Sequence, residues 1–176
     1  FFCSELIRLY IFVFEWSDMP LVRHRLDCCI CLVPPDRQYI HQLQTLAEEL
    51  LQAKKRHKLL PCGSFESILV ESFDHPRLYA NHQGGYRVGC PACSQNIAKA
   101  FSRAVENWRK GAERTMDCDS CFLGFPLEEA KGRPPFAFSS SSIILHDVQE
   151  AFLGDFWKER CDALLVEYCI IFRRVG

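Results

Sequence analysis

The stretch from residue 90 to residue 121, CPACSQNIAKAFSRAVENWRKGAERTMDCDSC, begins and ends with a Cys-x-x-Cys pair. A Cys-x-x-Cys turn lets two sulfurs approach one ion, and two such turns complete a tetrahedron of thiolates that leaves no coordination position open. The sequence therefore predicts one structural zinc ion bound by Cys90, Cys93, Cys118 and Cys121. A redox role for either pair is the alternative, and the presence of a second pair favours zinc.

Residues 86–130 around these pairs resemble a zinc-ribbon or zinc-knuckle module, although the gap between the pairs is slightly longer than in most ribbons. The resemblance is to a broad class and indicates no single family. Modules of this class bind nucleic acid, bind proteins or brace a fold. Between the two pairs, apolar residues recur at helical spacing and predict an amphipathic helix. These residues are Ile97, Phe101, Val105 and Trp108.

The module has a basic side, but the chain as a whole is almost neutral. The basic residues are Lys99, Arg103, Arg109, Lys110 and Arg114, and nearby acidic residues offset three of them. The chain contains 21 Lys and Arg against 22 Asp and Glu, for a net charge of −1. Proteins that coat nucleic acid or anionic membranes usually have a clear basic excess. The composition therefore favours a protein partner over nucleic acid, and no membrane partner is expected.

Outside the module, the apolar pattern predicts alternating strands and helices. Strands are predicted at residues 25–33, 65–73, 136–145 and 166–174. A long helix is predicted from Asp36 to Lys58, and two short helices are predicted to begin at Asp147 and Asp155. This order predicts an α+β fold, a small sheet with two to three helices, for which the ferredoxin-like arrangement is one candidate. The sheet would carry an inserted zinc-ribbon-like module with four cysteine ligands.

These patterns divide the chain into three parts. Residues 1–18 are expected to be an N-terminal extension, because the first methionine is Met19, and a first strand or helix docked on the core is the alternative. Residues 19–85 and 131–176 are expected to form the α+β core, with 86–130 as the zinc-binding insert. The apolar N-terminal stretch is short for a membrane span and lacks the features of a signal peptide.

The chain has 11 cysteines, an odd number, and several lie inside apolar runs. This usage indicates free and metal-bound thiols in a reducing compartment, so a cytoplasmic location is expected. One such run, Cys28-Cys29-Ile30-Cys31, resembles the opening of a RING finger, the module of many ubiquitin ligases. The histidines that follow Cys62 are too distant for a RING spacing, which favours buried cysteines in a strand.

No nucleophile motif or phosphate-binding loop accompanies the titratable residues outside the module. Those considered for acid–base work are Glu66, Glu71, Asp74, His75 and His146. No catalytic residue and no cofactor other than zinc is therefore predicted. The expected function is that of a small intracellular zinc-binding protein that binds another macromolecule, with a protein as the expected partner. The alternatives are a nucleic-acid-binding regulator that uses the basic side of the module, and an enzyme with an unrecognised site on the core.

Overall fold

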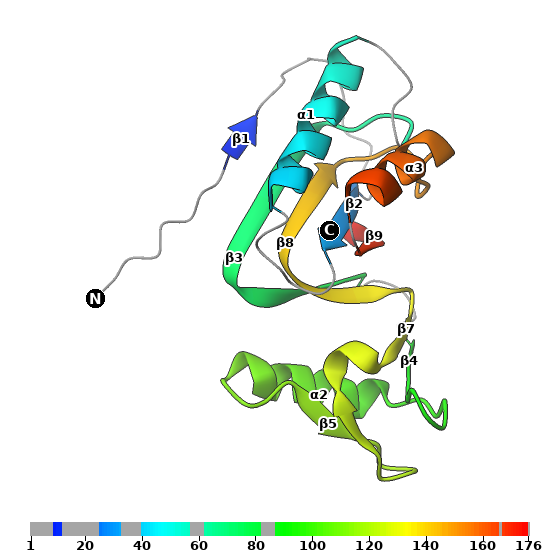
Figure 1. Ribbon diagram of the computed structural model, residues 1–176. Helices are drawn as coiled ribbons and strands as arrows, with labels where there is room; N and C mark the ends of the chain where they lie inside the picture. Colours follow the sequence, from blue (N-terminus) through cyan, green and yellow to red (C-terminus); the bar gives the residue numbers. More distant parts are fainter. Residues whose placement is uncertain are drawn as a thin grey trace, which may run out of the picture. The chain divides into compact units, whose positions relative to one another are not determined.

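The computed structural model describes residues 9–11, 25–32, 40–56, 62–81, 87–165 and 167–175. The chain divides into two compact units (Figure 1). The first unit comprises residues 1–80 and 137–176, and the second comprises residues 81–136. The insert was predicted to comprise residues 86–130, which lie within the second unit. No described helix is long and apolar enough to cross a membrane.

The first unit is built on a sheet with the strand order β1-β3-β8-β2-β9. The strands are β1 (Leu9–Ile11), β2 (Arg25–Leu32), β3 (Ser67–Ala80), β8 (Phe136–His146) and β9 (Tyr168–Val175). Helix α1 (Ile40–Lys55) follows β2 and helix α3 (Asp155–Leu164) follows β8. Strand β2 pairs antiparallel with β8 on one side and with β9 on the other, and β1 pairs antiparallel with β3.

Without the short strand β1 and the elements of the second unit, the order along the chain is strand, helix, strand, strand, helix, strand. If these four strands are numbered 1 to 4, their order across the sheet is 4-1-3-2. This is the connectivity of the ferredoxin-like fold. The predicted α+β class is therefore confirmed, with the second unit inserted in the hairpin connection between β3 and β8. The predicted extension over residues 1–18 lies mostly outside the described residues.

One apolar layer joins the two helices to the sheet. Helix α1 directs a continuous stripe toward the sheet because its apolar side chains recur every three to four residues. This stripe consists of Leu43, Leu46, Ala47, Leu50, Leu51 and Ala53, all of which are buried. Helix α3 adds Trp157 and Cys161 to the same layer. Figure 1 shows both helices on one face of the sheet.

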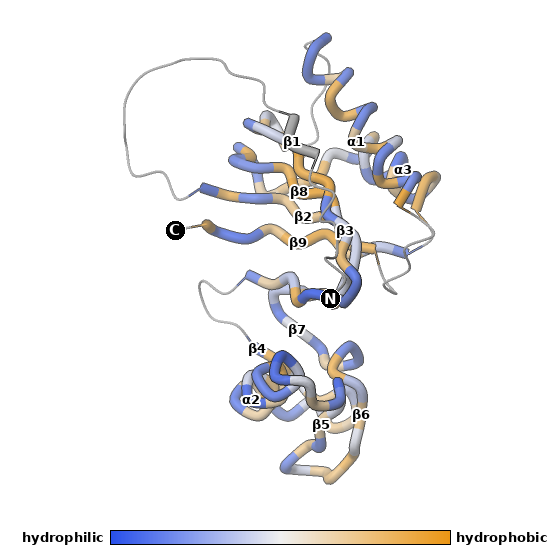
Figure 2. The backbone as a smooth tube through the Cα atoms, turned by 90° about the vertical axis from the view of Figure 1, so that its left-hand side faces the viewer, coloured by the Kyte–Doolittle hydropathy of each residue, from blue (hydrophilic) through white to orange (hydrophobic). Residues whose placement is uncertain are grey.

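The central strands β2 and β8 are buried on both faces, which explains their nearly continuous apolar sequence. Figure 2 shows this as apolar colour along the middle strands. The predicted strand at 136–145 is confirmed, and its run Ser139–Ser142 is buried within it. Ser139 exchanges two hydrogen bonds with the backbone of Ser141. Ser142 donates to the Tyr79 hydroxyl, which donates to Glu71. The side chains of Ser139 and Ser142 are therefore hydrogen-bonded, whereas the buried hydroxyls of Ser140 and Ser141 have no hydrogen-bond partner.

The helix predicted to begin at Asp147 is absent from the structure. Asp147 has φ +52°, and residues 147–154 form an irregular segment before α3. The N–H groups of Val148, Gln149 and Glu150 donate to the carbonyls of Leu26, Ser64 and Cys62. These backbone bonds to distant segments replace the local bonds that a helix would require.

Asp27 is a buried carboxylate at the end of this sheet, with a side chain that is 4% exposed. Its Oδ2 lies 3.1 Å from His146 Nδ1 and 3.1 Å from Arg173 Nη2. Arg173 is its direct cross-strand neighbour on β9. Burial alone raises the pKa of Asp27, but the hydrogen bonds and charges of His146 and Arg173 outweigh burial and hold the pKa below its ordinary value. The ion pairs therefore tie β2, β8 and β9 together.

We predict that Asp27→Asn lowers the free energy of unfolding by about 2 kcal/mol at pH 7, because charged partners lose their acceptor. A carboxylate with a lowered folded-state pKa stabilises the fold above its unfolded pKa, and this contribution disappears as the pH falls through the folded value. Urea unfolding should therefore show a difference from wild type that shrinks toward pH 3. Asp147→Asn, an exposed neighbour, is the control and should change little. Equal stability of wild type and Asp27→Asn at pH 7 would contradict the prediction.

In its described residues, the second unit contains two antiparallel strand pairs and one α-helix. Strand β4 (Arg87–Gly89) pairs with β7 (Lys131–Arg133), and β5 (Thr115–Asp117) pairs with β6 (Gly124–Pro126). Helix α2 (Ala98–Arg109) lies between β4 and β5, and the turn η2 (Leu127–Glu129) follows β6. Three of the four predicted helix positions, Ile97, Phe101 and Val105, are buried. The other buried apolar residues of this unit are Val88, Met116, Phe125, Leu127 and Ala130.

Candidate metal centre

The two Cys-x-x-Cys turns have the same backbone geometry. In the first turn the N–H of Ser94 donates to the carbonyl of Cys90 at 3.0 Å, and in the second the N–H of Phe122 donates to Cys118 at 2.9 Å. Each turn is closed by a second bond of 2.9 Å, from Cys90 N–H to the Gln95 carbonyl and from Cys118 N–H to the Leu123 carbonyl. The residue after the second cysteine has a positive φ in both turns, +60° for Ser94 and +58° for Phe122.

The strand pairs place these turns, because the first turn follows β4 and the second joins β5 to β6 in a hairpin. Gly124 opens β6 beside Asp117, and a Cβ atom added to it would lie 2.8 Å from the Asp117 carboxylate. This close approach lets the chain return directly after the second turn. In addition, the Lys131 ammonium donates to the Pro91 carbonyl at 3.2 Å and ties β7 to the first turn.

The structure brings the four predicted ligands together. The sulfurs of Cys90, Cys93, Cys118 and Cys121 all lie within 4.8 Å of one another. Two of the distances, Cys90 to Cys121 and Cys93 to Cys118, are 3.7 Å. A tetrahedral zinc ion with Zn–S bonds of about 2.3 Å requires sulfurs about 3.8 Å apart. The cluster therefore has the ligand type, number and spacing of a four-thiolate metal site and can hold one metal ion.

The backbone of each turn favours one thiolate. The N–H groups of Cys121 and Ser120 donate to the Cys118 sulfur and lower its pKa to about 6. The N–H of Cys93 acts in the same way to lower the pKa of Cys90. The N–H of Leu123 tends to lower the pKa of Cys121, but desolvation and contact with the other sulfurs raise it to about 12. A cation that replaces the remaining thiol protons would complete the charge balance, and its binding would release protons.

The other described cysteines do not extend this centre. Cys28 lies in the apolar layer beneath the helices and Cys31 lies on the opposite face of the same strand. A Cys-x-x-Cys pair in an extended strand points its sulfurs to opposite faces and cannot chelate one ion. Cys28 instead contacts the thiol of Cys62 in the core. Among the described residues, one group contains three or more possible metal ligands, and it consists of the four cysteines of the second unit. These residues therefore do not form the two-zinc arrangement of a RING finger.

Two of the five titratable residues considered for catalysis are engaged in the fold. Glu71 accepts a hydrogen bond from Tyr79 at 2.9 Å, and His146 pairs with Asp27. The end of α1 and the residues that follow it are basic, with the sequence Lys54-Lys55-Arg56-His57-Lys58. Lys54 has a structural role there, because its ammonium donates to the carbonyls of Phe65 and Glu66. His57 and Lys58 lie outside the described residues.

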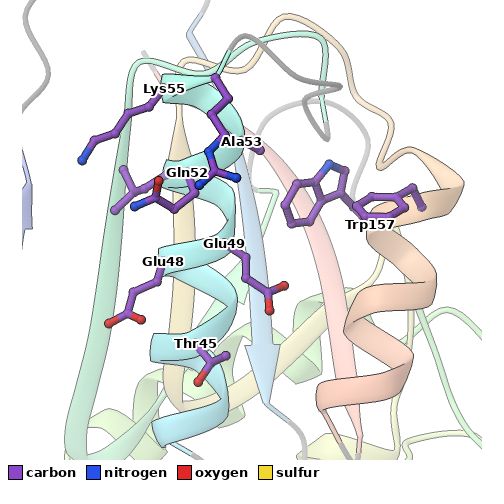
Figure 3. A pocket seen from close by; sticks show the side chains of 10 residues that line it. Thr45, Glu48, Glu49, Gln52, Ala53, Lys55 and Trp157 are labelled. Carbon is purple, nitrogen blue, oxygen red and sulfur yellow. The ribbon is translucent and has the colours of Figure 1, made fainter.

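An open groove of about 1070 Å³ lies along α1 and the start of α3 (Figure 3). Among its lining residues, Glu49 accepts two hydrogen bonds from Arg160, which hold the pKa of Glu49 below its ordinary value. The groove is lined by no cysteine, histidine or serine. The Thr45 hydroxyl donates to the carbonyl of His41 within α1, and Glu48, Lys55 and Arg56 are the other charged residues of the lining.

No protein family model, curated protein or solved structure matches this chain. The function must therefore be argued from its own residues. Sequence reasoning singled out the four clustered cysteines but overlooked Asp27 and Phe122. The positive φ at Phe122 follows from its equivalence to Ser94, and aligning the two Cys-x-x-Cys turns would have pointed to it.

We predict that the purified, reduced protein carries about one metal ion per chain, because the four sulfurs form one site. Cys118→Ser should reduce the metal content well below one, since it removes a ligand. Cys169→Ser, a half-buried thiol outside the cluster, is the control and should keep the metal. Elemental analysis of the three proteins checks this. Freely titratable thiols and no metal in the wild type would refute the site, and about two ions per chain would show a second one.

Proposed function

We propose that the chain is a zinc-braced protein-binding protein, in which zinc is structural and the second unit presents a binding surface. The observation that carries the proposal is the cluster of Cys90, Cys93, Cys118 and Cys121, with sulfurs within 4.8 Å. Four thiolates fill the coordination sphere of zinc and leave no position for a substrate or water. Such an ion braces the chain and performs no chemistry of its own.

Zinc is favoured over other metals because four cysteine sulfurs in a tetrahedral arrangement suit its ligand preferences. The second unit is small, and its apolar core contains few large side chains. Binding of structural zinc contributes on the order of 10 kcal/mol or more in small modules. The ion would therefore supply a large part of the stability of residues 87–133.

A protein partner is favoured by the charge distribution. On helix α2 the exposed residues Lys99, Arg103 and Lys110 follow one stripe, but Glu106 lies in the same stripe between Arg103 and Lys110. An acidic residue at this spacing interacts with both neighbours. Arg114, also on the predicted basic side, forms an ion pair with Glu128 at 2.6 Å. A surface interrupted in this way is poorly suited to a phosphate backbone.

We predict that removal of zinc loosens the second unit while the helix-covered sheet persists. Chelation of the wild type and the variant Cys118→Ser should both make residues 95–114 the first site of limited proteolysis. The reason is that the two Cys-x-x-Cys turns, residues 90–95 (the first knuckle) and 118–123 (the second knuckle), no longer anchor α2. Tryptophan fluorescence, to which Trp108 contributes together with Trp16 and Trp157, should shift toward that of a solvent-exposed indole. Chelated protein that stays as protease-resistant as the zinc-loaded protein would show that the ion is not structural.

For nucleic acid, we expect no tight binding near physiological salt, since the net charge is −1 and the basic stripe is interrupted. Binding to single- and double-stranded DNA and to RNA can be titrated at several salt concentrations. The nucleic-acid binding of the double variant Arg103→Ala/Arg109→Ala is compared with that of the wild type. Sub-micromolar, salt-sensitive binding that this double variant loses would favour the nucleic-acid-binding regulator over the protein-binding protein.

A further inference from the structure

The two zinc knuckles match in backbone but differ in the side chains at their tips. The residues that follow the second cysteine are Ser94 and Gln95 in the first knuckle and Phe122 and Leu123 in the second. Phe122 is 84% exposed and Leu123 is 44% exposed. Figure 2 shows apolar colour in the loop between β5 and β6. The second knuckle therefore carries two neighbouring apolar side chains into solvent.

Local structure does not account for Phe122. Its φ of +58° is disfavoured for a bulky residue, whereas small polar residues tolerate it more easily. The first knuckle makes the same turn and the same hydrogen bonds with a serine. With most of its surface in solvent, the phenyl ring gains little from burial. A strained, exposed aromatic residue at a position that serine fills elsewhere points to a role in binding.

We propose that Phe122 and Leu123 form an apolar anchor that inserts into an apolar pocket of a partner protein, with lysine or arginine side chains at the pocket rim. This inference rests on the proposed function and assigns the binding surface to the second knuckle. Large apolar side chains at the centre of a contact contribute most of the energy of many protein interfaces. Because the knuckle is held by the metal and by backbone bonds, the anchor loses little conformational freedom on binding.

The charge around the anchor selects the kind of partner. Asp117 and Asp119 are exposed on either side of Cys118, and residues 115–124 contain no lysine or arginine. Two carboxylates beside the anchor repel the phosphates of nucleic acid and of an anionic bilayer. The same carboxylates attract a basic rim on a protein and raise the rate of association at low salt.

The chain itself supplies the test variant. Phe122→Ser/Leu123→Gln gives the second knuckle the tip of the first, so it removes the anchor and keeps residues that the turn accepts. Two controls accompany it. Ser94→Phe/Gln95→Leu, combined with the first variant, moves the apolar pair to the first knuckle. Phe156→Ser removes a different aromatic ring, which is 57% exposed on α3. All variants should keep one zinc per chain, and the first should melt at or above the wild-type temperature.

The probe is a random-peptide display library selected against the zinc-loaded full chain. We expect enriched peptides that combine an apolar cluster with lysine or arginine. Calorimetric titration should show binding weakened about tenfold or more by Phe122→Ser/Leu123→Gln. Asp117→Asn/Asp119→Asn should weaken it less and reduce its salt dependence. Phe156→Ser should bind as wild type does, and the moved anchor should not restore binding to the first double variant.

Several results would contradict the proposal that Phe122 and Leu123 form a binding anchor. Enriched peptides that bind Phe122→Ser/Leu123→Gln as tightly as wild type would refute it and leave protein binding in place. A lower melting temperature of this variant would show that the two side chains brace the knuckle instead. Phe122-dependent binding of phosphatidylserine vesicles or of single-stranded DNA would assign the tip to a membrane or to nucleic acid. Failure of the proposed function is a separate outcome, recognised by a chain without zinc or by a selection that enriches no peptide.

Discussion

Four sulfurs lie within 4.8 Å of one another, so as thiolates they would repel one another unless a bound cation balanced their charge. Backbone N–H groups already favour thiolates at Cys90 and Cys118, but full ionisation of all four thiols is opposed by their mutual repulsion. A divalent ion bound here would remove this repulsion and would link the turn after β4 to the β5–β6 hairpin. A unit of this size has a marginal apolar core, so metal binding and folding are expected to be coupled.

The first unit needs no such brace because its helices and sheet share one large apolar layer. Its ferredoxin-like order also explains how the chain accommodates the insert. Strands β3 and β8 are neighbours in the sheet and consecutive in this order, so the second unit takes the place of a hairpin turn. Every strand pairing of the core and both of its helices lie outside the insertion. The two units can therefore be stabilised by different physical means, the first by apolar burial and the second by metal coordination.

Local patterns sufficed for the features that depend on local spacing. The helical stripe of α1, the apolar runs of β2 and the paired cysteines predicted a helix, a buried strand and a metal site. Features that depend on distant partners were not predicted. Asp27 is satisfied by His146 and Arg173, far along the chain, and residues 148–150 bond to Leu26, Ser64 and Cys62 instead of forming a helix. The exposure of Phe122 was equally invisible, because an apolar residue beside a metal ligand is just as consistent with a core position.

The two knuckles share the features that metal binding requires and differ in side chains that it does not require. Coordination fixes the cysteines, the positive φ and the two backbone bonds of each turn, and these are the same in both knuckles. The tip side chains lie outside these requirements, so the difference between Ser94 and Phe122 cannot be ascribed to zinc binding. A structural ion nevertheless affects recognition at such a tip, because it holds the backbone in one conformation before a partner arrives. The conformational entropy of the knuckle is then lost during folding and not during binding, so the contacts with a partner contribute more to the free energy of binding. Under the proposed function, loss of the metal would weaken binding even though the ion would touch no partner, so a structural ion would still contribute to recognition.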